Sequence, residues 1–278
     1  MNRLADGVLC GCARQLLSGP PTRHRRINSP ATSVSRLAVR EPLCHLAGVS
    51  DIAGNLQRVR ARMSAAAQRC GRDAAAVRLI GISKTQPAAV VQRAIDAGLA
   101  DVGENYVQEM IAKRPGVHGA VTWHLVGHLQ RNKAGRAVEL FDVIHSVDSR
   151  ALGQALARQG ERRQQAVQIL VEVNVGDERS KSGIAIDAAE PLIAALGDLR
   201  WLRIEGLMTI PPPGSKPDDS RPYFQTLRRL RDRLRATAPA NAPLRELSMG
   251  MTDDFEVAIE EGATMVRVGR AIFGERTG

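Results

Sequence analysis

The chain has 278 residues and a formal net charge of +10, and its composition is 44% hydrophobic but only 3% aromatic. This length accommodates one large barrel or two ordinary domains, with a core made mainly of Val, Ile, Leu and Ala. No apolar run reaches the roughly 18 residues that a transmembrane helix needs, so the sequence predicts none. All four cysteines lie at or before Cys70, which argues against a disulfide framework and favours a reducing, cytoplasmic location.

Residues 1–48 differ in character from the rest of the chain. They hold seven arginines but only two acidic residues, and they show little apolar periodicity. We expect this extension to be disordered. Its Arg-rich, Ser-rich and acid-poor composition also resembles an organelle transit peptide, and a wrongly assigned start is a third explanation. After residue 48 no basic block is interleaved with aromatic residues, which argues against nucleic-acid binding.

From residue 49 onward, helix-like and strand-like segments alternate. Ser50 is a candidate cap for a first helix in which apolar residues recur at helical spacing from Ile52 to Met63, and which ends near Cys70. Eight apolar segments then read as strands: Arg78–Ser83, Asp101–Asn105, Thr122–Val126, Val143–Val147, Gln168–Asn174, Arg203–Thr209, Glu246–Met249 and Met265–Val268. Amphipathic helices fit between most of them. One is the Arg-rich segment 223–236, whose arginines we assign to a solvated face.

Strict alternation of strands and helices predicts an α/β protein with a parallel sheet. Eight such units in residues 49–278 match a single (β/α)8 TIM barrel, preceded by one extra N-terminal helix. A doubly wound open sheet is the alternative. No G-x-G-x-x-G motif follows a strand, which counts against a dinucleotide-binding fold.

A barrel of this kind carries its functional residues at the C-terminal ends of the strands. Lys84 stands at the end of the first strand, just before Pro87, which cannot continue a central strand and suits the start of the next helix. A partly desolvated lysine at this position is a nucleophile toward aldehydes. The alternative is an ordinary exposed lysine on a loop.

The loops after the last two strands indicate a phosphate site. In such barrels these loops commonly bind phosphate through backbone N–H groups. Ser248 supplies a hydroxyl, Gly250 and Gly269 allow close approach of the backbone, and Arg270 adds a positive charge. Two ordinary helix-capping loops are the structural alternative.

A nucleophilic lysine that faces a phosphate site suggests pyridoxal 5′-phosphate (PLP) as the cofactor. The aldehyde would form a Schiff base with Lys84, and the phosphate would bind the two glycine-containing loops. An arginine beside the pyridine nitrogen leaves that nitrogen neutral and weakens the ring as an electron sink. Arg267 is the candidate for this position.

Seven segments carry a family resemblance. They are Ile82–Pro87, Gly103–Glu109, Trp123–Lys133, Ser180–Ile184, Gly206–Pro211, Ser248–Asp254 and Val266–Gly274. In sequence and order they resemble the YggS/PROSC family of PLP homeostasis proteins across residues 50–274. Leu125 stands where the family more often has Phe or Met, and residues 1–48 have no counterpart.

The resemblance implies a barrel like the N-terminal domain of alanine racemase, with PLP on Lys84 and no established turnover. It implies a role in buffering and delivering PLP. It places Asn105 near the 3-oxygen of the cofactor and adds Met208, at a strand end, to the expected binding set. Lys181, in a loop, is expected to be a phosphate or surface contact, and His124 to be structural.

Two functions from different classes stay open at this point. The first is a PLP carrier, with PLP-dependent apo-enzymes as candidate partners, a monomeric state, and neither a bound metal nor a membrane contact. The second is an amino-acid racemase-like enzyme, which needs a second acid/base group opposite the lysine. In alanine racemase-like enzymes a tyrosine of a C-terminal β domain fills that role, and we expect no such domain here. An aldolase acting on a phosphorylated sugar is the third and weakest interpretation.

Overall fold

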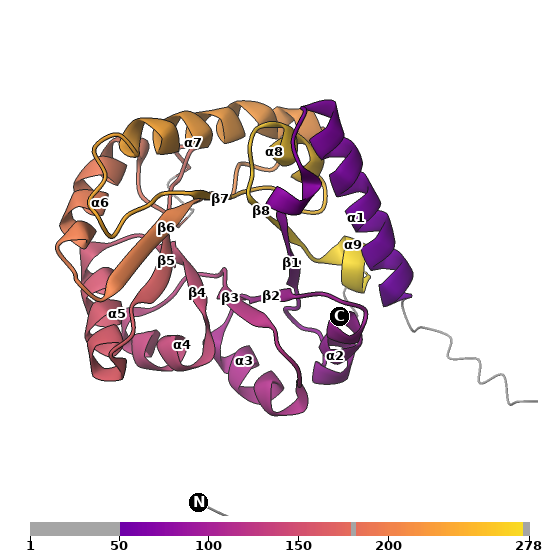
Figure 1. Ribbon diagram of the computed structural model, residues 1–278, viewed down its shortest axis with the longest axis horizontal. Helices are drawn as coiled ribbons and strands as arrows, with labels where there is room; N and C mark the ends of the chain where they lie inside the picture. The colour runs from indigo at the N-terminus through magenta and orange to yellow at the C-terminus, as the bar shows by residue number, and fades with distance from the viewer. Residues whose placement is uncertain (1–50, 179–181, 275–278) are drawn as a thin grey trace, which may run out of the picture. The chain divides into compact units, whose positions relative to one another are not determined.

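The computed structural model describes residues 51–178 and 182–274, and within them eight parallel strands close into a barrel (Figure 1). Each strand pairs with its neighbour in sequence, and the last pairs with the first. The strands are β1 (Arg78–Ile82), β2 (Asp101–Glu104), β3 (Thr122–Leu125), β4 (Val143–Val147), β5 (Val167–Glu172), β6 (Leu202–Met208), β7 (Glu246–Ser248) and β8 (Met265–Val268). The predicted (β/α)8 barrel is therefore confirmed.

Helices surround the barrel. They are α1 (Ile52–Arg69), α2 (Ala88–Asp96), α3 (Val107–Lys113), α4 (Ala134–Leu140), α5 (Arg150–Arg163), α6 (Ala189–Gly197), α7 (Arg221–Leu234), α8 (Phe255–Glu260) and α9 (Arg270–Phe273). Short 3-10 turns occupy Ala74–Ala76, Arg114–Gly116, Arg131–Lys133, Ile186–Ala188 and Pro217–Ser220. None of the helices in these ranges is long and apolar enough to cross a lipid bilayer.

All eight predicted strands are present. The bounds of β4 and β8 are those that the sequence predicts, and the others differ by one or two residues at one end or, for β5 and β6, at both ends. Pro87 precedes α2 as its cap, with an extended ψ of 151°, and is not its first helical residue. The predictions for residues 1–48, including the domain boundary at residue 49, fall outside the described residues and stay predictions.

The extra helix α1 packs against α8 and α9, so the first helix of the barrel unit lies beside the last ones (Figure 1). Its buried stripe runs from Ile52 through Leu56 and Val59 to Met63, as the spacing predicts. The prediction that Ser50 caps this helix is wrong. The cap is Asp51, whose side chain accepts the hydrogen bond from the N–H of Gly54.

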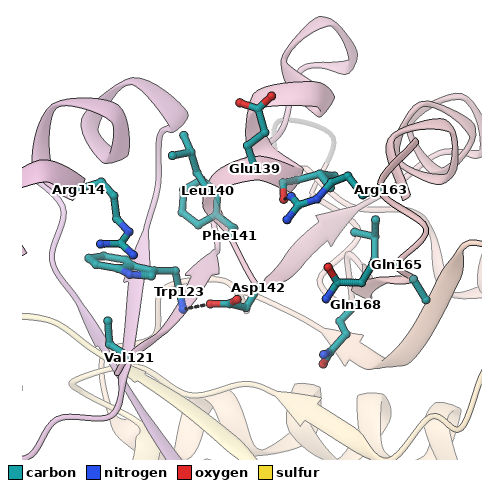
Figure 2. A pocket seen from close by; sticks show the side chains of 13 residues that line it. Arg114, Val121, Trp123, Glu139, Leu140, Phe141, Asp142, Arg163, Gln165 and Gln168 are labelled. Carbon is teal, nitrogen blue, oxygen red and sulfur yellow. Dashed lines mark hydrogen bonds between the residues drawn. The ribbon is translucent and has the colours of Figure 1, made fainter. Parts of the chain in front are cut away.

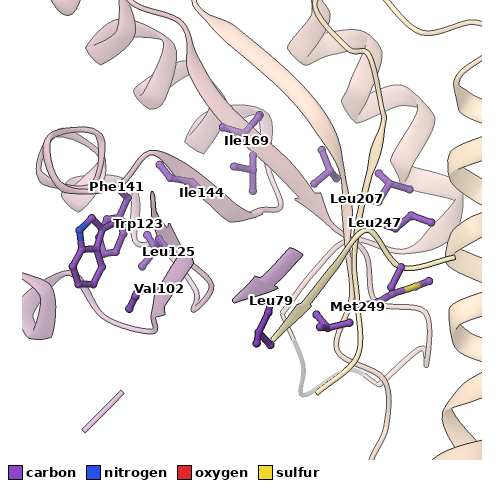
Figure 3. Close-up of a cluster of buried hydrophobic side chains, with 14 of the residues drawn as sticks. Leu79, Val102, Trp123, Leu125, Phe141, Ile144, Ile169, Leu207, Leu247 and Met249 are labelled. Carbon is purple, nitrogen blue, oxygen red and sulfur yellow. The ribbon is translucent and has the colours of Figure 1, made fainter. Parts of the chain in front are cut away.

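The barrel strands divide their side chains between two environments. Residues that point outward form the main hydrophobic core between strands and helices; Figure 3 shows Leu79, Val102, Leu125, Ile144, Ile169, Leu207 and Leu247 in this layer. A separate small apolar cluster is formed by Val143, Leu170 and Met208. Because side chains alternate along a strand, the second set faces the barrel interior. Several polar residues share that interior, and they matter for the site.

The Arg-rich helix α7 has the amphipathic form that its spacing predicts. Phe224, Leu227, Leu230 and Leu234 are buried, while Arg229, Arg233 and Arg235 are exposed. The arginine run is therefore the solvated face of a surface helix, and its leucines anchor that helix to the barrel.

This division predicts opposite outcomes for two neighbouring substitutions in α7. Leu230→Ala removes a side chain that is 2% exposed and should lower the free energy of unfolding by about 2–5 kcal/mol. Arg229→Ala, on the exposed face, should change it by less than about 0.5 kcal/mol. Urea denaturation of both variants tests the assignment, and equal losses would contradict it.

Candidate functional site

The chain turns sharply where β1 ends, and this turn presents Lys84. The N–H of Gln86 donates to the carbonyl of Ser83 at 3.0 Å, which closes the turn. Thr85 has a φ of 65°, in the left-handed region that β-branched residues rarely adopt. Its N–H donates to the carboxylate of Glu109 at 2.9 Å. Strain and hydrogen bonding together fix the backbone beside Lys84, which is itself half-buried.

A buried ion pair lies beneath this turn. Lys113 on α3 pairs with Glu104 at the end of β2, and it also donates to the carbonyl of Ser83 at 2.7 Å. The hydroxyl of Ser83 donates to the same carboxylate oxygen of Glu104. Burial raises the pKa of Glu104, and the hydrogen bonds from Lys113 and Ser83 oppose that shift. The residue preceding Lys84 is therefore tied to two other elements.

Two adjoining cavities open at the C-terminal ends of the strands, and Lys84 lines both of them. One has a volume of about 300 Å³ and is lined by Ile82, Lys84, Asn105, Val126, Gly127, His128, Glu172, Ser182, Ile210, Met251 and Arg267. The other has about 220 Å³ and adds Gln86, Thr252, Asp253, Gly269, Arg270, Phe273 and Gly274 to Ile82, Lys84, Met251 and Arg267. Ile210 and Met251 are each 38% exposed, which leaves apolar surface at the opening.

Arg267 is the buried cation of the site. Its side chain leaves β8 and is almost fully enclosed, at 4% exposure. One terminal nitrogen donates to the hydroxyl of Ser248 at 2.7 Å, and the other donates to the carbonyl of Thr209 at 2.8 Å. Burial lowers the pKa of Arg267 to about 10, although the charges of Asp254 and Glu172 raise it. The guanidinium therefore stays charged at neutral pH.

A chain of hydrogen bonds continues from Ser248 through the barrel interior. The Ser248 hydroxyl lies 2.9 Å from Nδ1 of His145, and Nε2 of His145 lies 2.9 Å from Nδ1 of His124. Nε2 of His124 lies 3.0 Å from a carboxylate oxygen of Asp101, at the start of β2. Both imidazoles are fully buried. Burial, followed by the charges of His124, Arg267 and Arg78, holds the pKa of His145 well below its ordinary value.

Glu172 is a buried carboxyl on the wall of the larger cavity. It ends β5 with 5% exposure, and its Oε2 atom has no hydrogen-bond partner. Burial and the neighbouring charge of Asp148 raise its pKa to about 7, against an opposing effect of Arg267. Glu172 therefore changes its charge near neutral pH, within the same cavity as Lys84.

The structure brings together five of the eight residues that the sequence assigns to the cofactor. Lys84, Asn105 and Arg267 line the larger cavity, and Gly269 and Arg270 line the smaller one with Lys84 and Arg267. A Cβ atom at Gly269 would meet nothing nearer than the carbonyl oxygen of Ile82 at 3.4 Å, so this backbone is open to approach. Contact with a ligand stays a prediction for all five.

Met208, Ser248 and Gly250 do not line either cavity. Met208 is buried in the small interior cluster, and the Ser248 hydroxyl is engaged by Arg267 and His145. Gly250 has a φ of 90°, and a Cβ atom there would lie 2.5 Å from Cβ of Ala258. The packing of α8 against this turn is thus a sufficient reason for glycine. Their assignment to the cofactor stays a prediction.

Three further residues of the site were not assigned from the sequence: Glu172, His145 and Lys113. His145 lies within β4 and Glu172 ends β5, and a titratable residue in a mostly apolar strand is the signal that could have found them. Lys113 carried no signal beyond the rarity of lysine. His124 is part of the buried chain, as expected for a structural histidine. Lys181 lies outside the described residues.

A separate pocket lies at the opposite end of the barrel, around the starts of β3 and β5 (Figure 2). Its wall includes Arg114, Trp123, Asp142 and Arg163, and the carboxylate of Asp142 accepts from the N–H of Trp123 at 2.8 Å. Barrel enzymes place their chemistry at the C-terminal ends of the strands. The cavity pair at Lys84 is therefore the candidate site.

Comparison with known proteins agrees with the barrel fold. Residues 54–277 match the family described as alanine racemase, N-terminal domain. The pyridoxal phosphate homeostasis protein of Escherichia coli K12 is 41% identical over 233 residues, covering 82% of this chain and 98% of that protein. The chain belongs to the family of pyridoxal phosphate homeostasis proteins, which matches the alanine racemase N-terminal domain. Its counterpart in Pseudomonas aeruginosa is 43% identical over 229 residues, with 82% and 97% covered.

A solved member of the family supports the match in three dimensions. PipY of Synechococcus elongatus, in a structure with PLP bound, is 37% identical with a TM-score of 0.71, and the match covers 80% of this chain and all of that one. The resemblance found in the sequence motifs is thus confirmed for the family and for the barrel.

The buried carboxyl predicts an unusual pH dependence of stability in the protein without cofactor. The folded state holds the Glu172 proton more tightly than the unfolded chain, because its pKa is raised from 4.5 to about 7. The stability that the folded protein gains from this tighter proton binding is fully present below about pH 4.5 and is lost as the pH rises to about 7. Glu172→Gln should therefore raise the free energy of unfolding by about 1–3 kcal/mol at about pH 8, with little effect at about pH 5.

Urea denaturation at the two pH values measures this difference. Glu161→Gln, an exposed glutamate on α5, is the matched control and should change stability by less than about 0.5 kcal/mol at either pH. An equal effect of Glu172→Gln at both pH values would contradict the raised pKa.

Proposed function

We propose that this protein binds PLP through Lys84 and holds it as a reserve for PLP-dependent enzymes, without turnover of its own. The observation that carries the proposal is that a half-buried lysine and a buried arginine line the same cavity at the C-terminal ends of the barrel strands. Its relatives are named pyridoxal phosphate homeostasis proteins, and PipY has been solved with PLP bound.

The residues of the two cavities match the chemical groups of PLP. Lys84 provides the amine for the aldehyde, and Asn105 provides an amide that can donate to the phenolic oxygen. The smaller cavity provides the open backbone at Gly269 and the cation of Arg270 for the phosphate. Ile82, Val126, Ile210 and Met251 supply apolar surface for a flat ring.

Lys84 would hold the cofactor through its amine, and bound PLP would supply an aldehyde carbon and an electron-withdrawing ring. Arg267 would favour retention of PLP over catalysis, since a charged guanidinium beside the ring nitrogen would leave that nitrogen unprotonated and the ring a weak electron sink. The hydrogen bonds from Arg267 to Ser248 and to the Thr209 carbonyl hold its guanidinium in this position.

A racemase-like activity is the second candidate, and Glu172 is the observation in its favour. A carboxyl with a pKa of about 7 in the cavity of Lys84 can accept or donate a proton at neutral pH. The names of the relatives favour the carrier. The monomeric state, the cytoplasmic location and apo-enzymes as recipients stay predictions.

The first test is the visible absorption of the purified protein with PLP, before and after borohydride. The wild type should show a yellow band, and borohydride should fix the cofactor to a peptide that contains Lys84. Lys84→Ala should lose the band and the label. Lys133→Ala, which removes a lysine outside both cavities, should keep them. A band and label that survive in Lys84→Ala would contradict the assignment.

The second test separates the carrier from the enzyme. The loaded protein should restore the activity of a PLP-dependent apo-enzyme, and it should not racemise amino acids when these are followed by chiral chromatography. Steady racemisation that is abolished in both Lys84→Ala and Glu172→Gln would overturn the carrier in favour of the racemase.

A further inference from the structure

A continuous line of polar groups runs through the barrel between its two ends. Arg267, at the cofactor end, lines both cavities beside Lys84. Asp101, at the other end, lines a separate pocket of about 270 Å³ near the starts of β1 and β2. Ser248, His145 and His124 join them through the hydrogen bonds described above. No group of histidine, cysteine and acidic side chains among the described residues is arranged to hold a metal ion, so metal binding does not explain this line.

The two ends of the line fix the direction of every hydrogen bond in it. A guanidinium can only donate, so Ser248 accepts from Arg267 and its own proton is available for Nδ1 of His145. A carboxylate can only accept, so Nε2 of His124 donates to Asp101. Nδ1 of His124 then carries no proton and accepts from Nε2 of His145. With both imidazoles neutral and protonated at Nε2, every group in the line has a partner.

The reverse direction fails at both ends. If His145 donated to Ser248, the serine hydroxyl would receive two donors and its own proton would lose this acceptor. Nε2 of His124 would then face the carboxylate of Asp101 with a lone pair unless the line took up an extra proton. That proton would place a second positive charge in the buried line that already holds Arg267. The forward direction is therefore the stable one.

We propose that Asp101, His124 and His145 are positioning residues that hold Arg267 in place through Ser248. This inference rests on the proposed function, in which Arg267 faces the ring of PLP. Because the Ser248 proton is committed to His145, the hydroxyl presents only lone pairs to the guanidinium. Together with the Thr209 carbonyl, this locks both terminal nitrogens of Arg267 and aims the planar group at the cavity.

The direction of the line is measurable in the protein without cofactor. Long-range ¹H–¹⁵N spectra of histidine side chains show which ring nitrogen carries the proton. We expect His124 and His145 each to carry one proton, on Nε2, as the hydrogen-bond directions require, and His145 to keep this state at about pH 6, where an ordinary histidine begins to charge. A proton on Nδ1 of either ring, or a charged ring, would overturn the inference. Each ring is assigned by its His→Gln variant.

The effect on the cofactor is tested with a pair of variants at His145. Glutamine carries an acceptor and a donor in one amide, so His145→Gln can accept from Ser248 and donate to His124. His145→Leu can do neither and leaves the Ser248 proton without its acceptor. We expect PLP to bind about tenfold more weakly to His145→Leu, which corresponds to one lost buried partner, and within about twofold of wild type to His145→Gln. Affinity is measured by titrating the visible band.

Thermal unfolding without cofactor provides the control for a purely structural role. If both variants lost PLP affinity in proportion to their loss of stability, or if His145→Leu bound PLP as the wild type does, the inference would be wrong. If the wild type itself bound no PLP, the proposed function would fail and the positioning role with it. If the wild type binds PLP but a histidine of the line carries its proton on Nδ1, this inference fails while the proposed function stands.

Discussion

A cation buried inside the barrel is the constraint on which the rest of the site depends. A guanidinium removed from water is tolerated only where acceptors surround it, since an unpaired buried charge is strongly destabilising. Arg267 obtains those acceptors from Ser248 and the Thr209 carbonyl, on β7 and just after β6. Parallel strands closed into a ring bring these ends to one rim, so the fold supplies what the charge requires. The buried guanidinium therefore requires polar groups inside an otherwise apolar barrel.

The lysine of the site is held in a different way, through its backbone. Thr85 takes a left-handed conformation, and the Ser83 side of the turn is tied to the buried pair of Glu104 and Lys113. These contacts use hydrogen bonds and strain to fix the direction in which Lys84 leaves the strand. Lys84 thus leaves a rigid turn, and its side chain lines the same cavity as the fixed guanidinium of Arg267.

The sequence predicts the architecture well because the barrel strands are continuous apolar runs separated by turn residues. It does not delimit the short helices α3 (Val107–Lys113), α4 (Ala134–Leu140) and α9 (Arg270–Phe273). Residues at strand ends were found because the barrel rule places them there. His145, within β4, was not found, since that requires knowing which face of the strand points inward. Glu172 was not found because the predicted fifth strand runs two residues past it, to Asn174. The same register explains why Met208 is enclosed and does not line a cavity.

A crystal structure of the protein loaded with PLP and then reduced with borohydride tests the central claim most directly. The account predicts continuous electron density from Nζ of Lys84 to the cofactor, the guanidinium of Arg267 beside the ring nitrogen, and the phosphate at the Gly269 turn. Density that joins the cofactor to another lysine, or a cofactor in the pocket around Trp123 and Arg163 at the opposite end of the barrel, would contradict it.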